Sequence, residues 1–457
     1  MGEQADTKTA PRKSAQWKSV VSWVVATTLF VLVIAVLHAT TGFGGLATGV
    51  GAALLAMWFF ALHKNRGRRR QLWAAVWAFS AVTLVWDGIT FVDYVTTYNG
   101  DSTTQKMSTW GRDHGLSPII DYLEKEAYSK PPSTKPADEL SLGLPSTTST
   151  TTPATDSTTT DPNAETTTTL PQPEPPAPLA TYIQPALAGE GQWVPIAKVA
   201  GVDAVWVTSL RPLAKYGSVV ATVVVLDPTN MRIGMFNGRE LPGGNWVRDD
   251  HVPETIQPAL VAAMNGAFRL EHLYGGYMTE GKVVKPLENR MGTIGITRDG
   301  KLVLGELGRD MMDDGSWQSL RQNGLLMVDG GLSQVDRARA ERVSWGAAGT
   351  GDLFVNRSAV CTMTNGRIAY VMAGMVDPTQ MAQVLIEAGC DKAVQLDINN
   401  QWPNFMVFTH AADGTINGFT VDRRMRNDPG RYLKVSSKEF FAYFDSTLLP
   451  ATSELDA

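Results

Sequence analysis

The stretch AVQLDINNQWPNFMVF, residues 393–408, decides how the C-terminal part of this 457-residue chain is understood. A short apolar run ends in the carboxylate of Asp397, a polar turn follows, and a second apolar run begins at Phe405. Apolar runs separated by Asn and Pro are typical of β-strands joined by a loop, and such loops often carry binding and catalytic residues. The same pattern is equally typical of a plain hairpin loop whose Asn and Pro residues only shape the turn.

The N-terminal part of the chain has the pattern of a membrane anchor. Three apolar runs, at 19–37, 43–62 and 72–92, are each near the length that a helix needs to cross hydrocarbon. The basic cluster between the second and third runs, and the basic N-terminus at 1–18, are expected on the cytoplasmic side. We therefore predict three transmembrane helices within residues 19–95, a cytoplasmic N-terminus and an extracytoplasmic C-terminal part, at the cell membrane. A cleaved signal peptide is disfavoured because two further apolar runs follow the first.

Two segments separate the predicted anchor from the remainder of the chain. Residues 96–130 have a weak helical pattern, which predicts a short juxtamembrane helical segment. Residues 131–181 are dominated by Thr, Ser and Pro, and this composition is too poor in apolar side chains to fold. We predict that they form a disordered stalk that spaces the next domain from the lipid. The composition then becomes globular, which predicts an extracytoplasmic domain over residues 182–457.

The C-terminal domain is predicted to be α+β, with mostly antiparallel strands and a few helices. Asp299-Gly300 and Asn365-Gly366 each stand between two apolar runs, a pattern that predicts β-hairpins. Residues 219–226 are expected to pair with residues 231–236 across an Asp-Pro-Thr-Asn turn. One helix is predicted at 379–389, preceded by Asp377 and Pro378 and ended by Gly389.

Charge and cysteine content limit the classes of partner. The net charge of −5 is small and no basic stripe with aromatic residues is present, so a nucleic-acid partner is not expected. The two cysteines, Cys361 and Cys390, either form a disulfide in an exported domain or remain buried thiols on strands.

Several landmarks of the C-terminal domain occur in one order. They are Asn265-Gly266-Ala267-Phe268, the hairpin from Gly275, the run NGLLMVDGG from Asn323, Arg357-Ser358-Ala359, the helix before Gly389, and Leu396-Asp397. In this order the chain, from about 192 to 444, resembles the phosphodiester glycosidase domain family. The resemblance implies a hydrolase that cleaves the bond between the anomeric carbon of a sugar and a phosphodiester oxygen.

The chain departs from the family pattern within residues 393–408. The family usually reads Leu-Asp-Gly-Gly-Gly-Ser, whereas this chain continues from Asp397 with Ile398-Asn399-Asn400-Gln401-Trp402. Glycine lets the backbone approach a ligand closely, and the bulkier residues do not. Ala267 likewise replaces the second Gly of the Asn-Gly-Gly turn. The retained residues favour an enzyme, while the altered loop favours a non-catalytic glycan-binding or envelope-assembly module.

Cleavage of a glycosyl phosphodiester needs an acid or a base, and a group that neutralises the phosphate charge. The catalytic candidates are Asp397 as acid or base, Arg357 as a fork for phosphate oxygens, Asn265 for a sugar hydroxyl or water, and Glu271 as a second carboxylate. Each has a plainer interpretation as a turn or ion-pair residue.

The candidates for substrate binding follow the same two turns. They are His272, which is also a candidate proton donor, Asn399 and Asn400 for sugar hydroxyls, and Trp402 for stacking on a sugar ring. The sequence requires no cofactor, and a divalent cation held by Asp397 and amide oxygens is left open. The expected partners are a cell-envelope glycan or phosphate-linked polysaccharide, and the lipid bilayer.

Overall fold

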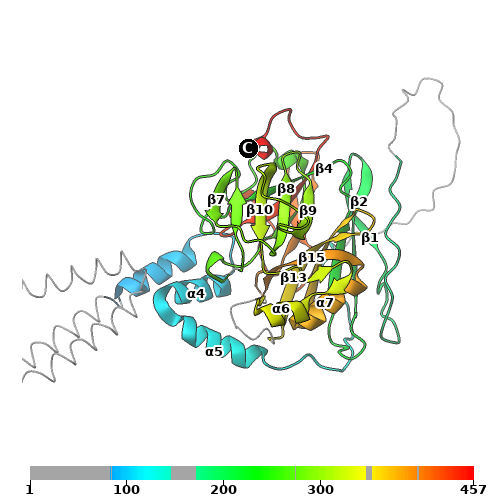
Figure 1. Cartoon of the computed structure of the whole chain (residues 1–457). Coiled ribbons are helices and arrows are strands. Elements are labelled where there is room, and N and C mark those ends of the chain that lie inside the picture. The colour runs from blue at the N-terminus through cyan, green and yellow to red at the C-terminus, as the bar shows by residue number, and fades with distance from the viewer. Residues whose placement is uncertain (1–82, 84, 146–170, 273, 346–352, 399–400) are drawn as a thin grey trace, which may run out of the picture. The chain divides into compact units, whose positions relative to one another are not determined.

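The computed structural model describes residues 83, 85–145, 171–272, 274–345, 353–398 and 401–457 (Figure 1). They fall into two compact units: unit 1 is Met1–Thr97 with Thr103–Leu123, and unit 2 is Tyr98–Ser102 with Glu124–Ala457. The predicted spans at 19–37 and 43–62, and most of the span at 72–92, lie outside the described residues. Within the described ranges, no helix is both long and apolar enough to cross a membrane.

Unit 1 is helical where the structure describes it. Residues 85–96 form a helix, followed by α4 (Thr103–Gly111), the π-helical turn η1 (Arg112–Leu116) and α5 (Ser117–Tyr128), whose last residues belong to unit 2. Gly115 adopts a φ of 83°, a conformation open to glycine, and kinks the chain between α4 and α5. These helices occupy the segment for which helical structure was expected.

The described residues of unit 2 form three antiparallel sheets. The largest has the strand order β1-β2-β3-β14-β13-β15-β11-β12, the second β7-β6-β10-β8-β9, and the third β17-β16-β5-β18-β4. The strands of the largest sheet are β1 (Val194–Val199), β2 (Val202–Leu210), β3 (Ala221–Leu226), β11 (Val328–Asp329), β12 (Leu332–Ser333), β13 (Val355–Met363), β14 (Ile368–Val376) and β15 (Cys390–Ile398). Those of the second are β6 (Tyr277–Thr279), β7 (Lys282–Lys285), β8 (Gly292–Thr297), β9 (Leu302–Glu306) and β10 (Trp317–Gln322). Those of the third are β4 (Met231–Phe236), β5 (Leu260–Asn265), β16 (Phe405–His410), β17 (Ile416–Thr420) and β18 (Phe440–Asp445).

Few helices accompany these sheets in the described part of unit 2. They are α6 (Val335–Glu341), α7 (Pro378–Glu387), α8 (Arg431–Lys434) and the 3-10 turns η2 (Gln257–Ala259), η3 (Leu270–His272) and η4 (Glu454–Asp456). The helix predicted before Gly389 is confirmed as α7. Its N-cap Asp377 accepts a hydrogen bond from the backbone N–H of Gln380, whose side chain bonds back in a capping box. The prediction of an α+β domain with mostly antiparallel strands is confirmed.

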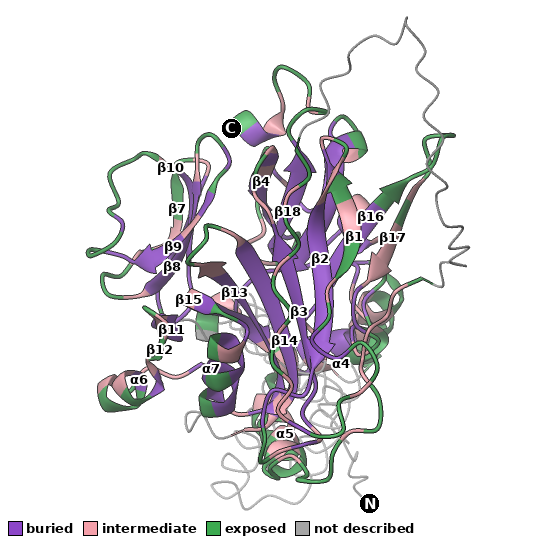
Figure 2. Cartoon of the chain, turned by 90° about the vertical axis from the view of Figure 1, so that its right-hand side faces the viewer, coloured by how far each residue is buried: buried purple, intermediate pink, exposed green. Residues whose placement is uncertain are grey.

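The largest and third sheets pack face to face. Val224 and Tyr370 from the largest sheet meet Met264, Val407 and Tyr443 from the third in one buried core. Helices α6 and α7 cover the other face of the largest sheet, where a second core forms. The central strands of the largest sheet are therefore buried on both faces, which agrees with their nearly continuous apolar sequence (Figure 2).

Two kinds of strand prediction have different outcomes. The hairpins at Asp299-Gly300 and Asn365-Gly366 are confirmed as β8–β9 and β13–β14. The expected pairing of β3 with β4 is wrong, because β3 pairs with β2 and β14 while β4 pairs with β18 in another sheet. The same applies to the opening stretch: β15 and β16 belong to different sheets, so the loop between them crosses from one layer to the other instead of closing a hairpin.

The ends of the predicted stalk pack on unit 2. The backbone N–H of Ala137 donates to the carbonyl oxygen of Gly217 at 2.9 Å, and that of Leu179 donates to Gly191 at 3.0 Å. The described residues at the two ends of the predicted stalk are therefore in backbone contact with unit 2. Residues 146–170 lie outside the described residues.

A disulfide joins two neighbouring strands of the largest sheet. Cys361 on β13 and Cys390 at the start of β15 are bonded, with their Cα atoms 5.6 Å apart. Both side chains are buried. Of the two interpretations of these cysteines, the structure has the disulfide.

Candidate active site

Asp397 lies near the end of β15, where the pairing with β13 contains a bulge. Arg357 pairs with Ile398, and Ala359 pairs with Gln395. The single residue between them on β13, Ser358, therefore stands opposite two residues of β15, Leu396 and Asp397. A bulge redirects a side chain that regular alternation would send to the other face. Asp397 is thereby directed toward the ends of the third sheet.

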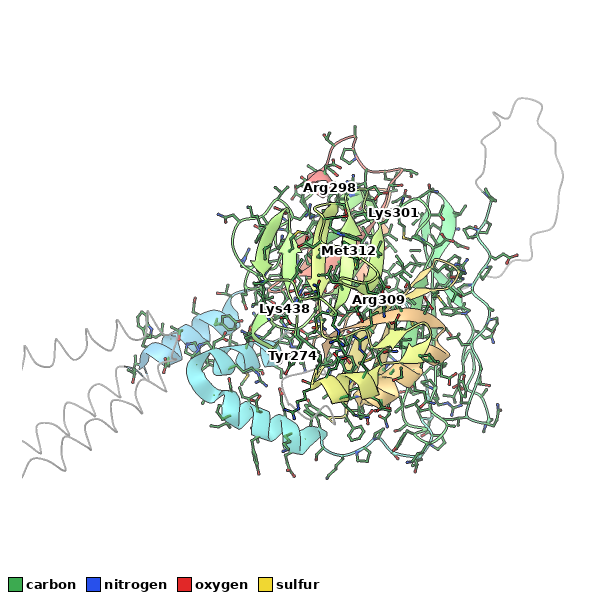
Figure 3. All side chains as sticks on the ribbon, in the orientation of Figure 1. Tyr274, Arg298, Lys301, Arg309, Met312 and Lys438 are labelled. Carbon is green, nitrogen blue, oxygen red and sulfur yellow. A yellow bond between two sulfur atoms is a disulfide. The ribbon has the colours of Figure 1, made fainter. Side chains whose placement is uncertain are left out.

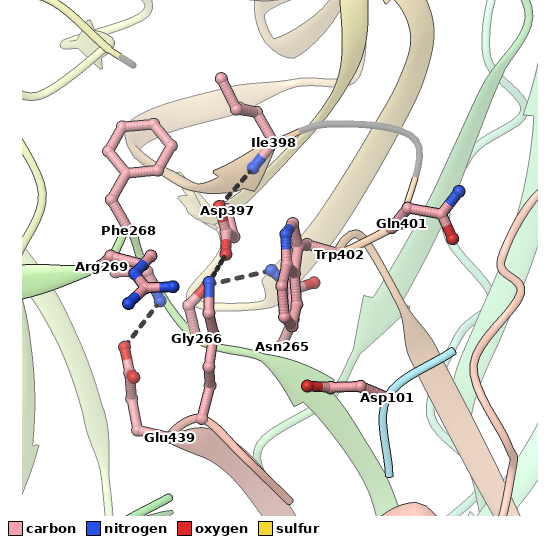
Figure 4. A network of polar contacts seen from close by, with 12 residues as sticks. Asp101, Asn265, Gly266, Phe268, Arg269, Asp397, Ile398, Gln401, Trp402 and Glu439 are labelled. Carbon is pink, nitrogen blue, oxygen red and sulfur yellow. Dashed lines mark hydrogen bonds and ion pairs between the residues drawn. The ribbon is translucent and has the colours of Figure 1, made fainter. Parts of the chain in front are cut away.

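The Asp397 carboxylate is buried and is held from two sides. Lys438 Nζ lies 2.6 Å from Oδ2, and the backbone N–H of Ile398 donates to Oδ1 at 2.9 Å. The backbone of Asp397 is fixed as well: its N–H donates to the carbonyl oxygen of Gly266 at 3.0 Å, and its carbonyl accepts from Ser358 Oγ at 2.9 Å. Figure 4 shows Asp397 between Ile398 and Gly266. A strand, a turn and the segment before β18 thus set the position of this one acid.

Lys438 supplies a cation beside Asp397. Its side chain is only 10% exposed, and Nζ stands 3.7 Å from the centroid of the Trp402 ring, well within the range of a cation–π interaction. Its backbone carbonyl accepts from Ser436 Oγ at 2.7 Å. An ammonium has three donors and Asp397 occupies one, so Lys438 retains the capacity to bind an anionic ligand.

The Asn265 carboxamide is a buried hydrogen-bonding centre at the end of β5. Its Oδ1 accepts from Tyr370 Oη at 3.1 Å and from the backbone N–H of Asn404 at 3.0 Å. Its Nδ2 donates to the carbonyl oxygen of Gly266 at 2.9 Å and to Ser358 Oγ at 3.2 Å. Burial raises the pKa of Tyr370 well above its ordinary value, so this hydroxyl remains a donor.

Asn265 and Asp397 are therefore brought together, because both bond to the Gly266 carbonyl and to the Ser358 hydroxyl. The Asn265 amide is engaged within the protein at both its oxygen and its nitrogen. These bonds fix the turn on which Asp397 rests, and the predicted contact of Asn265 with a sugar hydroxyl or water stays a prediction.

A second ion pair closes the turn after β5. Glu439 Oε1 accepts from the backbone N–H of Ala267 at 3.0 Å and lies 2.7 Å from Arg321 Nη2. Arg321 also donates to the carbonyl oxygen of Phe268 at 2.6 Å. A Cβ on Gly266 would stand 2.7 Å from Glu439 Oε1, so the close approach of this carboxylate requires glycine.

Arg357 does not join this cluster. Its guanidinium is buried among backbone and side-chain oxygens: it donates to the carbonyls of Val376, Trp345 and Leu353 and to Gln395 Oε1. Burial lowers the pKa of Arg357 to about 10. Alternate residues of a strand face opposite sides, so Ser358, and not Arg357, faces Asp397. Arg357, predicted as a fork for phosphate oxygens, thus donates to protein oxygens, and the cation beside Asp397 is Lys438.

The predicted second carboxylate lies on the surface. Glu271 belongs to the 3-10 turn η3, where its side chain is 49% exposed and ion-paired with Arg269. His272 ends the same turn. Their roles as second carboxylate and proton donor stay predictions.

The loop after Asp397 is described only in part. Asn399 and Asn400 lie outside the described residues. Trp402 is half-buried, and its ring lies against Lys438. Among the described residues, no group of three or more His, Cys, Asp and Glu side chains is arranged to hold a metal ion.

The cluster combines a base or acid with a cation and an aromatic ring. Asp397 can exchange a proton with water or with a leaving group, Lys438 can neutralise a phosphate, and the Trp402 ring can contact a sugar. All three groups are placed by segments that meet at one edge of the packed sheets. This arrangement suits a glycosyl phosphodiester better than a neutral glycoside, because the acid is accompanied by a positive charge.

One protein family matches part of this chain, and the matched part contains Asn265 and Asp397. Residues 259–397 match the phosphodiester glycosidase family. The matched range begins one residue before β5 and ends at Asp397, so it contains the turn at Asn265 and Asp397 itself, but not the loop after Asp397. The resemblance inferred from the sequence is confirmed over this range, whereas Trp402 and Lys438 lie beyond it.

Three solved structures are similar to the chain at low identity. The catalytic domain of zebrafish N-acetylglucosamine-1-phosphodiester alpha-N-acetylglucosaminidase, auto-inhibited by its pro-peptide, is 16% identical, with a TM-score of 0.36, covering 58% of this chain and 86% of that chain. A hypothetical protein from Synechocystis is 10% identical, with a TM-score of 0.36, covering 55% and 64%. A putative exported protein from Burkholderia pseudomallei is 11% identical, with a TM-score of 0.26, covering 52% and 76%. No curated protein matches the chain.

The sequence interpretation missed Lys438 and Glu439. Both stand directly before the wholly buried strand β18, in the run Ser436-Ser437-Lys438-Glu439. A charged pair at the entrance to an apolar strand must be paired if it is buried, and this feature could have pointed to Lys438. No local pattern around Lys438 indicates which acid it meets.

Proposed function

We propose that this chain is a hydrolase of glycosyl phosphodiesters and that it cleaves the bond between the anomeric carbon and the phosphodiester oxygen. The observation that carries the proposal is the contact of 2.6 Å between Asp397 Oδ2 and Lys438 Nζ at the end of the range that matches the phosphodiester glycosidase family. The reaction requires a group that exchanges a proton and a group that neutralises the phosphate charge, and this carboxylate and this cation supply the two.

In the proposed reaction, a water molecule adds to the anomeric carbon while the carbon–oxygen bond to phosphate breaks. Asp397 accepts the proton of the water, and the electron pair of the broken bond leaves with the phosphate. The products are a free sugar and a phosphate monoester. Such a monoester has a second pKa of about 6, so it leaves as an anion without being protonated. One carboxylate and one cation therefore suffice where an ordinary glycosidase uses two carboxylates.

Lys438 neutralises the phosphate in this scheme. Its remaining donors bind a non-bridging phosphate oxygen while one donor stays on Asp397. The charge that grows on the leaving oxygen is then met by a cation held in a largely buried position, where its effect is stronger than in water. Trp402 packs on the sugar ring. A divalent cation would be an addition to this scheme and is not needed by it.

The proposed setting is the outer side of a membrane. The three apolar runs anchor the chain there with its N-terminus in the cytoplasm, and the substrate is a phosphate-linked glycan of the cell envelope. The disulfide between Cys361 and Cys390 supports an oxidising compartment, because such bonds are rare in the reducing cytosol.

A non-catalytic glycan-binding or envelope-assembly module is the second candidate. The replacement of the flexible glycine loop after Asp397 by bulkier residues favours it. The ion pair of Asp397 with Lys438 also satisfies both charges without a substrate. This candidate predicts sugar binding without turnover.

The test compares the full-length protein with its Asp397→Asn variant on synthetic methyl phosphodiesters of N-acetylglucosamine, glucose and mannose. We expect the wild-type protein to release reducing sugar and the variant to be slower by a factor of about 10²–10⁴. Asp299→Asn, in an exposed hairpin turn, is the matched control and should retain wild-type turnover. Binding of these compounds by the wild-type protein with no release of sugar would establish the glycan-binding module instead.

A further inference from the structure

Five residues between the last predicted span and the predicted stalk pack on the segments that form the candidate site. The part of the stalk at 146–170 is called the Thr-rich stretch below. We call the five-residue segment, Tyr98–Ser102, the strap; it belongs to unit 2 although the residues on both sides of it belong to unit 1. Asn99 and Gly100 are buried, and a Cβ on Gly100 would stand 2.4 Å from the carbonyl oxygen of Val435. The strap is therefore in close backbone contact with the domain that carries Asp397.

One path of contacts runs from the strap to the site through the loop after Asp397. Ser102 Oγ donates to Gln401 Oε1 at 3.0 Å, and Gln401 immediately precedes Trp402. The Trp402 ring in turn lies against the ammonium of Lys438, which is paired with Asp397. Figure 4 shows Asp101 of the strap in the same close view as Gln401, Trp402 and Asp397.

A second path runs through a buried ion pair. Asp101 Oδ1 lies 3.2 Å from Arg431 Nη2, and the two side chains are 1% and 2% exposed. Arg431 Nη2 also donates to Ser436 Oγ at 3.0 Å, and Ser436 Oγ donates to the carbonyl oxygen of Lys438 at 2.7 Å. Breaking a buried pair of this kind is costly, so the strap and the Lys438 segment are held together as one body.

The first two residues of the strap, Tyr98 and Asn99, make two further contacts. Tyr98 Oη donates to Asp428 Oδ2 at 2.6 Å, and Asn99 Nδ2 donates to Glu240 Oε1 at 3.0 Å. Burial of the ring and, after it, the hydrogen bond to Asp428 raise the pKa of Tyr98 well above its ordinary value, so it remains a donor near neutral pH.

The strap also lies close, along the chain, to the last predicted membrane span. Six positions separate Val92, the end of that span, from Tyr98, and an extended chain of this length reaches at most about 20 Å. Residues 92–96 are helical, which shortens the reach. The helix over residues 85–96 leaves four of its apolar side chains more than half exposed; they are Val85, Trp86, Ile89 and Val92. A bilayer is the partner that fits an uncovered apolar face continuous with a predicted span.

We propose that the substrate of this site is a glycosyl phosphodiester whose alcohol component is a membrane lipid. This inference rests on the proposed function and adds the substrate class to it. The strap places the site near the bilayer surface, and a lipid-linked phosphodiester is presented at that surface. Hydrolysis releases the sugar into the aqueous phase and leaves the lipid monophosphate in the membrane, with the proton and electron transfers already described.

The Thr-rich stretch does not set this spacing. It follows the strap in the chain, and the segments on both of its sides bond to unit 2. Lengthening it would leave the distance between the span and the site unchanged. The two units are joined at Thr97–Tyr98, Ser102–Thr103 and Leu123–Glu124, so lengthening the chain at all three of these positions would release the site from the surface. The insertions at the unit boundaries and the insertion in the Thr-rich stretch are therefore a matched pair.

The experiment uses the full-length protein in liposomes and two substrates that share one sugar 1-phosphate, made with methanol and with octadecanol. We expect the wild-type protein to cleave the octadecyl ester at least about 10-fold faster, because protein and substrate are confined to one surface. A flexible Gly-Ser linker of about 30 residues at each of the three unit boundaries, 97/98, 102/103 and 123/124, should abolish this preference and preserve cleavage of the methyl ester. The same linker between Ser157 and Thr158 should preserve the preference.

The outcomes separate the two proposals. Cleavage of both esters at equal rates by the wild-type protein, or a preference that survives the three insertions at the unit boundaries, would overturn the lipid-linked substrate and leave the hydrolase intact. Absence of cleavage of either ester would overturn the proposed function, and this inference with it.

Discussion

Two adjacent residues, Lys438 and Glu439, make two buried ion pairs on the same turn, and the two pairs differ in how fully they are bonded. Glu439 and Arg321 are surrounded by backbone partners, including Ala267 and Phe268. Lys438 meets Asp397 and the face of an aromatic ring, with side chains 10% and 9% exposed.

The difference separates a structural pair from a functional one. A buried charge with saturated hydrogen bonds has nothing left to offer a ligand, and it serves to hold the chain in position. A cation with unused donors beside a carboxylate at the edge of the fold can take part in binding. Arg357 belongs to the first kind, because its donors go to protein oxygens.

The largest effect is expected from breaking the saturated pair. Glu439→Gln leaves the Arg321 charge buried without its partner, so the free energy of unfolding should fall by about 3–5 kcal/mol. Urea denaturation measures this change. The double variant Arg321→Met with Glu439→Gln should lose less than the single one, and an equal or greater loss would show that the pair is not the source of the stability.

Removing the cation of the other pair should act on turnover more than on stability. Lys438→Met is expected to lower kcat by a factor of about 10²–10³, because a donor that stabilises developing charge is lost. Lys438→Arg, which keeps the charge, should restore part of the rate. Steady-state kinetics with a methyl phosphodiester would measure both. A wild-type kcat in Lys438→Met would contradict the assignment of Lys438 and Asp397 as the functional pair.

Local sequence patterns predicted the elements better than their arrangement. The Asp299-Gly300 turn specifies a hairpin by its own backbone preferences, so it could be recognised without tertiary information. The β3 and β4 strands look like hairpin partners locally, yet each pairs with strands far away in the chain. Sheet partners are chosen by long-range packing, which a local pattern does not contain.

The site was predicted in part for the same reason. Asp397 and Asn265 lie in turns that the sequence marks clearly, and the structure brings them together. Which way Arg357 points depends on strand alternation and on a bulge in the neighbouring strand, and neither can be read from its own surroundings. Lys438 reaches Asp397 only because the third sheet packs on the largest sheet.

The disulfide between Cys361 and Cys390 is a covalent link outside the site. Cys390 begins β15 and Asp397 lies near its end, so the bond stabilises the strand at a distance from the chemistry. The double variant Cys361→Ala with Cys390→Ala should lose about 2–4 kcal/mol of unfolding free energy, given the 29-residue separation of the cysteines. Its kcat should remain that of the wild-type protein at a temperature where both are folded. A loss of kcat in the folded variant would mean that the two ends of β15 are coupled.

The smallest effect is expected from an exposed ion-pair network. Asp310 pairs with Arg309 at 2.6 Å and with Lys392 at 2.9 Å, with its side chain 26% exposed (Arg309 is labelled in Figure 3). The hydrogen bonds from Arg309 hold the pKa of Asp310 well below its usual value of 3.8. A lowered carboxyl pKa stabilises the fold above the unfolded value, and this contribution is lost as the pH falls below it.

Asp310→Asn should therefore cost no more than about 1 kcal/mol at neutral pH, because solvent screens the pair. The difference between wild type and variant should shrink as the pH is lowered from about 4 to about 2. Thermal unfolding at several pH values would measure it. A difference that stays constant over this range would show that the charge of Asp310 is not its cause.

The position of bond cleavage tests the central claim most directly. Hydrolysis of a methyl sugar 1-phosphodiester in water labelled with heavy oxygen, followed by mass spectrometry, identifies the product that receives the water oxygen. The account predicts that the label enters the sugar, because Asp397 directs water to the anomeric carbon and the phosphate leaves with its own oxygen. Label in the phosphate would mean attack at phosphorus, and would contradict a glycosidase mechanism at this site.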